Sequence, residues 1–269
     1  MTRLVIQQFL LERKRKGYSS STVHGIHATL AKVLQTAVEQ EYLESNSARA
    51  IQIGEREPKQ ERKLLSLAEV RMLISNLIDP CRTVAIVAVL AGMRIGEILA
   101  LRWKRIKFQR GTLEVAETFS DGVFGPPKTR SSRRVIPMST ALQEALESHK
   151  CRWLRIGPED LVFCTSTGTP LSPKNLYNRV LAPTCDRVGL PRVSWHSFRH
   201  TNATLLGEVG ESLKTAQAIL GHSDLETTLN TYMHAIPDSQ RRAVERVAGV
   251  LFPDVPKLTP TSTEAAGAN

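Results

Sequence analysis

The stretch of sequence that decides the fold covers residues 84–97 and reads VAIVAVLAGMRIGE. The part before Gly92 is the most apolar run of the chain. It is far shorter than the roughly 20 residues that a helix needs to cross a bilayer, so it predicts a buried core helix. Gly92 and Gly96 loosen the backbone on either side of Arg94, and Glu97 follows Arg94 by one helical turn. An arginine placed in this way can lie partly buried, with the carboxylate of Glu97 holding its guanidinium.

Two further helices are predicted ahead of this stretch. Apolar residues recur at helical spacing over residues 3–16 and again over residues 20–43. Each predicted helix has an apolar face that needs cover, and two helices cannot close a core alone. We therefore predict a partial helical domain over residues 1–50. The charged segment 51–63, which contains glycine and proline, is predicted to be an interdomain linker.

The larger domain is predicted over residues 64–255. It is expected to be mainly α with a small antiparallel β-sheet, which is an α+β fold. The predicted strands are 106–108, 111–118 and 133–137. The predicted helices after them are 141–150, 173–188, 196–208, 212–220 and 225–231. Pro183 should kink or split the second of these helices. Residues 256–269 have a composition typical of a disordered tail.

Composition restricts the classes of function. Lys and Arg number 36 against 26 Asp and Glu, which leaves a formal net charge of +10. This excess favours a polyanionic partner without proving one. The four cysteines are widely spaced and contain no C-x-x-C pair, so neither a zinc site nor a disulfide framework is predicted. Residues 1–16 are charged and contain no cleavable apolar segment, so we expect a cytoplasmic protein that does not enter a membrane.

Several side chains have the chemistry that phosphodiester cleavage without a metal requires. That reaction needs a nucleophile, donors for the charge on the phosphate oxygens, and an acid for the leaving oxygen. Arg94 is a candidate donor, although with Glu97 it could equally form an ordinary surface pair. His196 and Arg199 are three residues apart at the start of a predicted helix, near its positive end. A lone histidine on a helix is more often structural, and we interpret His200 in that way.

His222 and Tyr232 add two further candidates. His222 lies in the sequence LGHS, residues 220–223, ten residues ahead of Tyr232. A tyrosine usually titrates near ~10, so a nucleophilic tyrosine needs positive charge around its phenolate. The alternative is that Tyr232 is a half-buried aromatic residue, which is the commoner fate of tyrosine.

A basic segment lies between two of the predicted strands. Lys128 stands in a predicted turn, from which a lysine can reach a phosphate and donate a proton to a leaving oxygen. Most loop lysines only solvate a surface. Together with Lys128, the residues Arg130, Arg133 and Arg134 are predicted to contact the DNA backbone, which is a less specific signal.

The order and spacing of these residues together resemble a known family. The motifs AGMRIGE (91–97), HSFRH (196–200) and LGHS (220–223), with Lys128 and Tyr232, are similar to the catalytic signature of the tyrosine recombinases, or phage integrase family. The resemblance extends over nearly the whole chain. It implies a site-specific DNA recombinase, with residues 64–255 as the catalytic domain and residues 1–50 as a partial core-binding domain that is short at its N-terminus.

The resemblance also implies a role for each residue. Tyr232 would attack the scissile phosphate and form a 3′-phosphotyrosine, while Arg94 and Arg199 would hold the non-bridging oxygens. The remaining roles are a donor to the phosphate for His222, the acid for the leaving 5′-oxygen for Lys128, assistance in proton transfer for His196, and orientation of Arg94 for Glu97. The bond energy is conserved, so no ATP is expected. These basic residues already supply the charge that a metal would provide, so no metal or other cofactor is expected.

The implied partner is double-stranded DNA carrying a recombination site, bound by four copies of the chain, in the integration or excision of a mobile element. Apolar residues at helical spacing near the C-terminus could pack on a neighbouring copy or on the same domain: Val244, Val247, Ala248 and Leu251. Two other readings remain. A type IB topoisomerase would relax supercoils without strand exchange, and a non-catalytic DNA-binding protein derived from a recombinase would form no covalent adduct.

Overall fold

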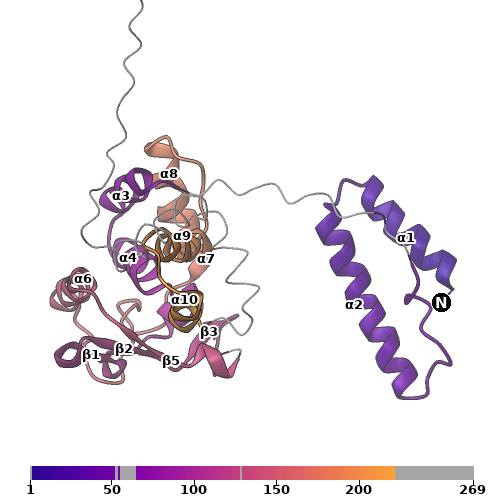
Figure 1. Ribbon diagram of the computed structural model, residues 1–269, viewed down its shortest axis with the longest axis horizontal. Coiled ribbons are helices and arrows are strands. Elements are labelled where there is room, and N and C mark those ends of the chain that lie inside the picture. The colour runs from indigo at the N-terminus through magenta and orange to yellow at the C-terminus, as the bar shows by residue number, and fades with distance from the viewer. Residues whose placement is uncertain (1, 52–53, 55–64, 128, 222–269) are drawn as a thin grey trace, which may run out of the picture. The chain divides into compact units, whose positions relative to one another are not determined.

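The computed structural model describes residues 2–51, 54, 65–127 and 129–221 of the 269 residues. It divides into two compact units, Met1–Lys63 and Leu64–Asn269 (Figure 1). Each unit has its own cluster of buried hydrophobic residues.

The first unit is a pair of helices, α1 (Arg3–Arg15) and α2 (Ser20–Glu39). Ile6 and Leu10 of α1 are buried together with Val23 and Leu34 of α2. The segment after α2 completes this core with Ala48 and Ile51. A third layer of chain therefore supplies part of the cover that two helices alone cannot provide.

The return of the chain after α2 explains why this helix ends at Glu39 and not near residue 43. Glu41 takes a left-handed conformation with φ of 62°, and the N–H of Tyr42 donates to the carbonyl of Ala37 at 2.8 Å. This arrangement closes the helix and reverses the chain. The side-chain amide of Asn46 then donates to the carbonyl of Ala31 at 2.9 Å and holds the returning segment against α2.

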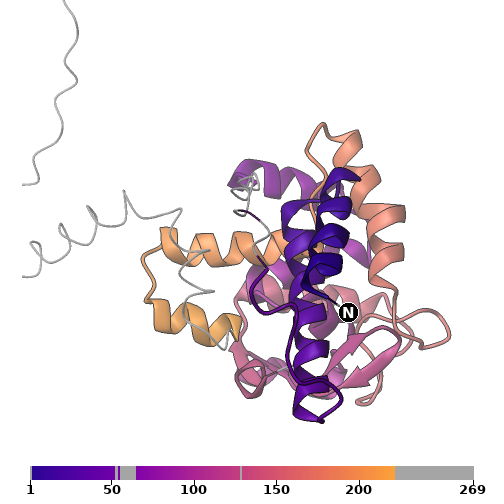
Figure 2. The same cartoon turned by 90° about the vertical axis from the view of Figure 1, so that its right-hand side faces the viewer.

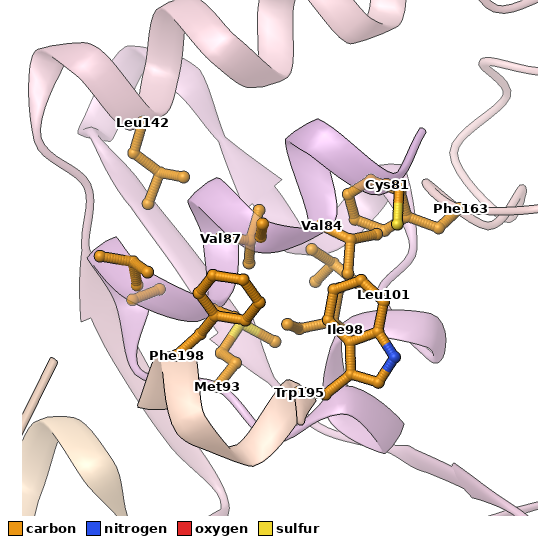
Figure 3. Packing of buried hydrophobic residues seen from close by; sticks show 14 of the residues in the cluster. Cys81, Val84, Val87, Met93, Ile98, Leu101, Leu142, Phe163, Trp195 and Phe198 are labelled. Atoms are coloured by element: carbon orange, nitrogen blue, oxygen red, sulfur yellow. The ribbon is translucent and has the colours of Figure 1, made fainter. Parts of the chain in front are cut away.

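The second unit is built around α4 (Cys81–Ala91), the helix predicted from the apolar run. Most of its side chains are buried, and it packs against α6 (Thr140–Cys151) and α9 (Trp195–Glu208). Figure 3 shows Val84 and Val87 of α4 gathered with Met93, Phe198 and other apolar side chains in one cluster. No helix in the described part of the chain is both long and apolar enough to cross a membrane.

The sheet is small and antiparallel, as predicted, but it is divided into two parts. A three-stranded sheet has the order β1-β2-β5, and the strands are β1 (Ile106–Lys107), β2 (Thr112–Val115) and β5 (Arg134–Pro137). A separate hairpin joins β3 (Thr118–Ser120) to β4 (Val123–Gly125). The single strand predicted over residues 111–118 is therefore wrong, because the chain leaves the sheet after Val115. Asp121, with φ of 51°, and Gly122 form the hairpin turn, and its return strand β4 was not predicted.

Five further α-helices lie in the described part of the second unit. Their bounds are α3 (Leu67–Asn76), α5 (Ile95–Leu99), α7 (Pro173–Leu176), α8 (Ala182–Arg187) and α10 (Leu213–Leu220). The capping box of Ser66 and Glu69 is present at the start of α3. A π-helical turn, Tyr177–Leu181, separates α7 from α8 just before Pro183, so the predicted split is confirmed. The predicted helix 225–231 and tail 256–269 lie outside the described residues.

Gly96 marks the point where α5 packs closely on β3. A Cβ atom added at Gly96 would lie 2.7 Å from the carbonyl oxygen of Phe119 and 2.8 Å from Oγ1 of Thr118. We predict that Gly96→Ala lowers the free energy of unfolding of this unit by about 1–3 kcal/mol, because the backbone must shift to admit the methyl group. Thermal or urea unfolding measures it. Gly125→Ala is the matched control, since no atom lies within 4 Å there. Equal effects of the two substitutions would contradict this packing.

Candidate active site

The backbone turns sharply between α4 and α5. Gly92 ends α4 in the left-handed conformation, with φ of 60°. A Cβ at this position would lie 2.6 Å from Oδ1 of Asn202, so both the conformation and the space require glycine. The side-chain amide of Asn202 on α9 donates to the carbonyl of Val89 at 2.6 Å. Together these contacts fix the end of α4 against α9. They thereby set the backbone position of Arg94, two residues after Gly92.

Arg94 is held at one edge by Glu97. The backbone N–H of Arg94 donates to Oε2 of Glu97 at 2.9 Å, and Nη1 of Arg94 donates to Oε1 at 2.8 Å. The first of these bonds caps the start of α5. The Arg94 side chain stays 39% exposed, whereas that of Glu97 is only 3% exposed. The arginine therefore combines a fixed inner edge with an accessible outer part.

Arg134 shares the same carboxylate from the opposite side. Its Nη2 donates to Oε2 of Glu97 at 3.0 Å, and its Nη1 donates to Oε1 at 3.3 Å. Its Nε donates to the carbonyl of Ile219, the second-last residue of α10, at 2.6 Å. The basic segment around Arg134 predicts that this residue contacts DNA. The structure corrects this expectation, because Arg134 points inward from β5 and its side chain is only 6% exposed.

Arg199 is buried beside this group. Its Nη1 donates to the carbonyl of Gly92, and its Nη2 donates to the carbonyl of Leu220 at 2.5 Å. In Figure 2 the ribbons of α9 and α10 run side by side in opposite directions, so the end of α10 lies near the start of α9, where Arg199 is. Burial and the charge of Arg94 lower the pKa of the Arg199 guanidinium to about 9, so it still carries its charge at neutral pH.

Arg94, Glu97, Arg134 and Arg199 form what we call the arginine cluster. Burial alone would raise the pKa of the Glu97 carboxyl, but the charges and hydrogen bonds of Arg134 and Arg94 outweigh it and leave that pKa below the usual 4.5. Three guanidinium groups around one carboxylate leave two positive charges in excess. An anion placed against them would relieve their mutual repulsion, and the planar guanidinium fork matches two oxygens of a phosphate.

The histidines of α9 differ in environment from Arg199. His196 is exposed near the start of the helix, whereas Arg199 is buried. The ring of His196 meets the ring of His200 edge-on, with 4.4 Å between their centroids. The three-residue spacing therefore brings His196 to the same end of α9 as Arg199 but leaves it on the surface.

Other predicted site residues fall partly outside the description. Lys128, His222 and Tyr232 are not among the described residues, and nothing is described of the side chain of Arg130. Arg133 is described and exposed, as a contact with DNA requires. The description ends at Gly221, which has φ of 64° and directly follows α10. The structure thus brings together Arg94, Glu97 and Arg199, while the other members of the predicted site are known only from the sequence.

Comparison with known proteins identifies the family. The model of the phage integrase family matches residues 57–238, which is more than half of the chain. This protein belongs to the phage integrase family. It is thus an enzyme of the tyrosine recombinase class, as the motifs around Arg94, Arg199 and His222 suggested.

Individual relatives agree with this assignment. A tyrosine recombinase XerC-like protein of Caldanaerobacter subterraneus subsp. tengcongensis is 29% identical and covers 89% of this chain and 69% of its own length. The ICEBs1 integrase of Bacillus subtilis is 28% identical over 93% of this chain and 72% of its own. Among solved structures, the Tn1549 transposon integrase in complex with a circular intermediate DNA matches with a TM-score of 0.77 at 23% identity. That alignment covers 92% of this chain and 85% of the integrase chain, and it shows a shared fold.

The buried position of Arg134 was missed, although the sequence contains a signal for it. Side chains alternate between the two faces of a strand, so Arg134 lies on the same face as Ile136. Ile136 is in the core, and the burial of β5 alternates from Arg134 onward. The exposed neighbours Arg133 and Val135 lie on the other face. The period of two would have separated the two consecutive arginines into one outward and one inward side chain.

We predict that Glu97→Gln destabilises the second unit at neutral pH by about 3–5 kcal/mol, because it leaves buried positive charge without its partner. The folded-state pKa of Glu97 is lowered, so its contribution to stability is present above pH 4.5 and is lost as the pH falls through the folded value. The difference in the free energy of unfolding between the two proteins should therefore shrink below pH 4.5.

Chemical unfolding at a series of pH values measures this difference. Glu117→Gln is a suitable control, because Glu117 is more exposed and pairs with Arg102 outside the cluster. A difference that stays constant from pH 7 down to pH 3 would contradict the assigned charge state of Glu97.

Proposed function

We propose that this protein cleaves and rejoins DNA strands at a specific site through a 3′-phosphotyrosine at Tyr232, in the integration or excision of a mobile element. The observation that carries the proposal is the arginine cluster, which combines excess positive charge with the accessible guanidinium of Arg94. Membership of the phage integrase family adds to it. The solved relatives include integrases and recombinases in complex with DNA, which supports DNA as the partner.

The chemical step can be written with these residues. The phenolic oxygen of Tyr232 forms a bond to the scissile phosphorus, and the bond from phosphorus to the 5′-oxygen breaks. Lys128 gives its proton to that leaving oxygen, while His196 assists removal of the proton from Tyr232. A 5′-hydroxyl of a partner strand later reverses the step. Because one phosphate ester replaces another, no nucleotide is consumed.

Charge develops on the non-bridging oxygens during this step. Arg94 and Arg199 would stabilise it, and His222 would donate a hydrogen bond to one of these oxygens. Arg94 is held by Glu97 and Arg199 by two backbone carbonyls, so neither side chain has to be ordered during the reaction. Donors that are fixed in advance are the most effective kind in a site of low dielectric constant.

The organisation on DNA belongs to the same proposal. Residues 1–50 would act as a core-binding domain and residues 64–255 as the catalytic domain, with residues 51–63 linking them. Four copies would assemble on two duplexes in the cytoplasm, using the C-terminal apolar stripe that includes Val244 and Leu251. Arg133 and Arg130 would contact the phosphate backbone.

We predict that Tyr232→Phe abolishes covalent adduct formation while leaving DNA binding unchanged, because it removes one oxygen and almost no volume. Incubation with nicked half-site DNA, followed by denaturing electrophoresis, detects the adduct. Tyr177→Phe removes the same oxygen elsewhere in the second unit and should leave the adduct intact. An adduct formed by the Tyr232 variant would show that another residue is the nucleophile. Relaxation of supercoiled DNA without strand exchange would favour a type IB topoisomerase.

We also predict that Arg133→Gln weakens DNA binding and reduces the slope of log affinity against log salt by about 0.9, the value for one phosphate contact on duplex DNA. A titration of labelled duplex at several salt concentrations measures this slope. Arg192→Gln is the control, because both oxygens of Asp186 already engage that exposed arginine. An unchanged slope for the Arg133 variant would remove this residue from the DNA-binding surface.

A further inference from the structure

Arg134 lies in the site, but none of the roles proposed above involves it. It makes hydrogen bonds to both oxygens of Glu97, to the carbonyl of Ile219 and, at 2.9 Å, to the carbonyl of Ser132. A guanidinium with only 6% of its side chain exposed does not contact a duplex, so its charge acts within the protein.

We propose that Arg134 is a positioning residue for the cleavage reaction, which fixes Arg94 through Glu97 and fixes the chain before His222 through Ile219. The proposal rests on the function proposed above, because it assumes that Arg94 and His222 act on the phosphate. Arg134 acts only through these neighbours.

Arg134 affects the charge that Arg94 can offer to a phosphate. Glu97 accepts two hydrogen bonds from Arg94 and two from Arg134, so its single negative charge is shared between two guanidinium groups. If Arg134 were absent, Glu97 and Arg94 would form a one-to-one pair, and the positive charge of Arg94 would be largely neutralised. Arg134 therefore keeps part of the charge of Arg94 free for a phosphate while the carboxylate holds its orientation.

Arg134 also contacts the end of α10. The carbonyls of the last helical turn are the negative end of the helix and lack partners inside it. Arg134 donates a hydrogen bond to the carbonyl of Ile219, and Arg199 donates one to the carbonyl of Leu220. A Cβ at Gly221 would lie 2.9 Å from Nη1 of Arg134, so the two residues are packed in direct contact. The described chain thus leaves α10, one residue before His222, at a point set by Arg134.

Two substitutions separate charge from geometry. Arg134→Lys keeps the charge, but one ammonium group cannot reproduce the planar fork that spans Glu97 and Ile219. Arg134→Met removes the charge and leaves Glu97 to Arg94 alone. Arg105→Lys is the matched control, because Arg105 is also ion-paired, to Glu114 at 2.6 Å, but lies outside the arginine cluster. Thermal melts establish that each variant is folded, and the Lys variant carries the test if the Met variant does not fold.

The measurement is single-turnover cleavage of nicked half-site DNA at saturating protein, with the Kd for the duplex measured separately. We expect Arg134→Lys to lower the cleavage rate at least about tenfold, a loss comparable to part of one transition-state donor. The Kd should change much less than the cleavage rate, its salt slope should stay unchanged, and Arg105→Lys should cleave normally. In an Arg94→Ala background the same substitution should cost less, because one of its two routes of action is gone. A purely structural role would reduce the rate by the same factor in both backgrounds.

Three results would overturn the proposal. They are a normal cleavage rate in Arg134→Lys, a loss confined to Kd and its salt slope, and an equal loss in the presence and absence of Arg94. A second readout does not depend on cleavage. Inorganic phosphate should raise the Tm of the unsubstituted protein by binding the arginine cluster, and less so in the Arg134 variants.

This second readout also separates the two proposals. If the unsubstituted protein forms no adduct, the recombinase mechanism fails, while the phosphate titration still judges Arg134. An undiminished phosphate effect in Arg134→Lys would then show that Arg134 does not organise the cluster.

Discussion

The arrangement of the second unit depends on the hydrogen bonds that Arg94 and Arg134 donate to the buried carboxylate of Glu97. A carboxylate that is only 3% exposed cannot remain charged without partners, and among the described residues Arg94 and Arg134 donate all four of the hydrogen bonds that it accepts. These two residues belong to segments far apart in the sequence, at the start of α5 and in β5. The need to satisfy one charge therefore joins the helical part of the unit to its sheet. Loss of both arginines would leave a buried carboxylate without a partner, so this contact ties the two parts of the unit together.

Arg134, one of the two partners of Glu97, also brings a helix end into the site. α10 presents its last carbonyls to Arg134 and Arg199, so two positive charges meet the negative end of a helix. This is favourable for the helix and only partly neutralises the arginines, because a helix end carries about half a charge. Within the described residues the cluster therefore keeps a surplus of positive charge. A phosphate bound as the proposed function requires would balance part of this surplus.

Much of this could be predicted from the sequence, because the strongest signals are local. The apolar run before Gly92 and the interruption before Pro183 each depend on neighbouring residues, and each is present. The division of residues 111–118 between two strands could not be predicted in the same way, since it depends on the docking of the β3–β4 hairpin on α5 at Gly96. The end of α2 at Glu39 likewise depends on where the returning segment packs.

In the site, too, local contacts could be predicted and contacts between distant segments could not. Arg94 and Glu97 are three residues apart, and their pairing could be inferred from helical spacing, as could the placement of Arg199 on α9. The second partner of Glu97 is Arg134, which is 37 residues away in sequence. No local sequence pattern indicates that these two residues form a pair. Two consecutive arginines look alike in a basic segment, yet the alternation of a strand sends one to the surface and the other to the core. In the role that we propose for it, Arg134 contributes to the reaction on DNA without contacting DNA. It does so by orienting Arg94 and by keeping part of the charge of Arg94 available.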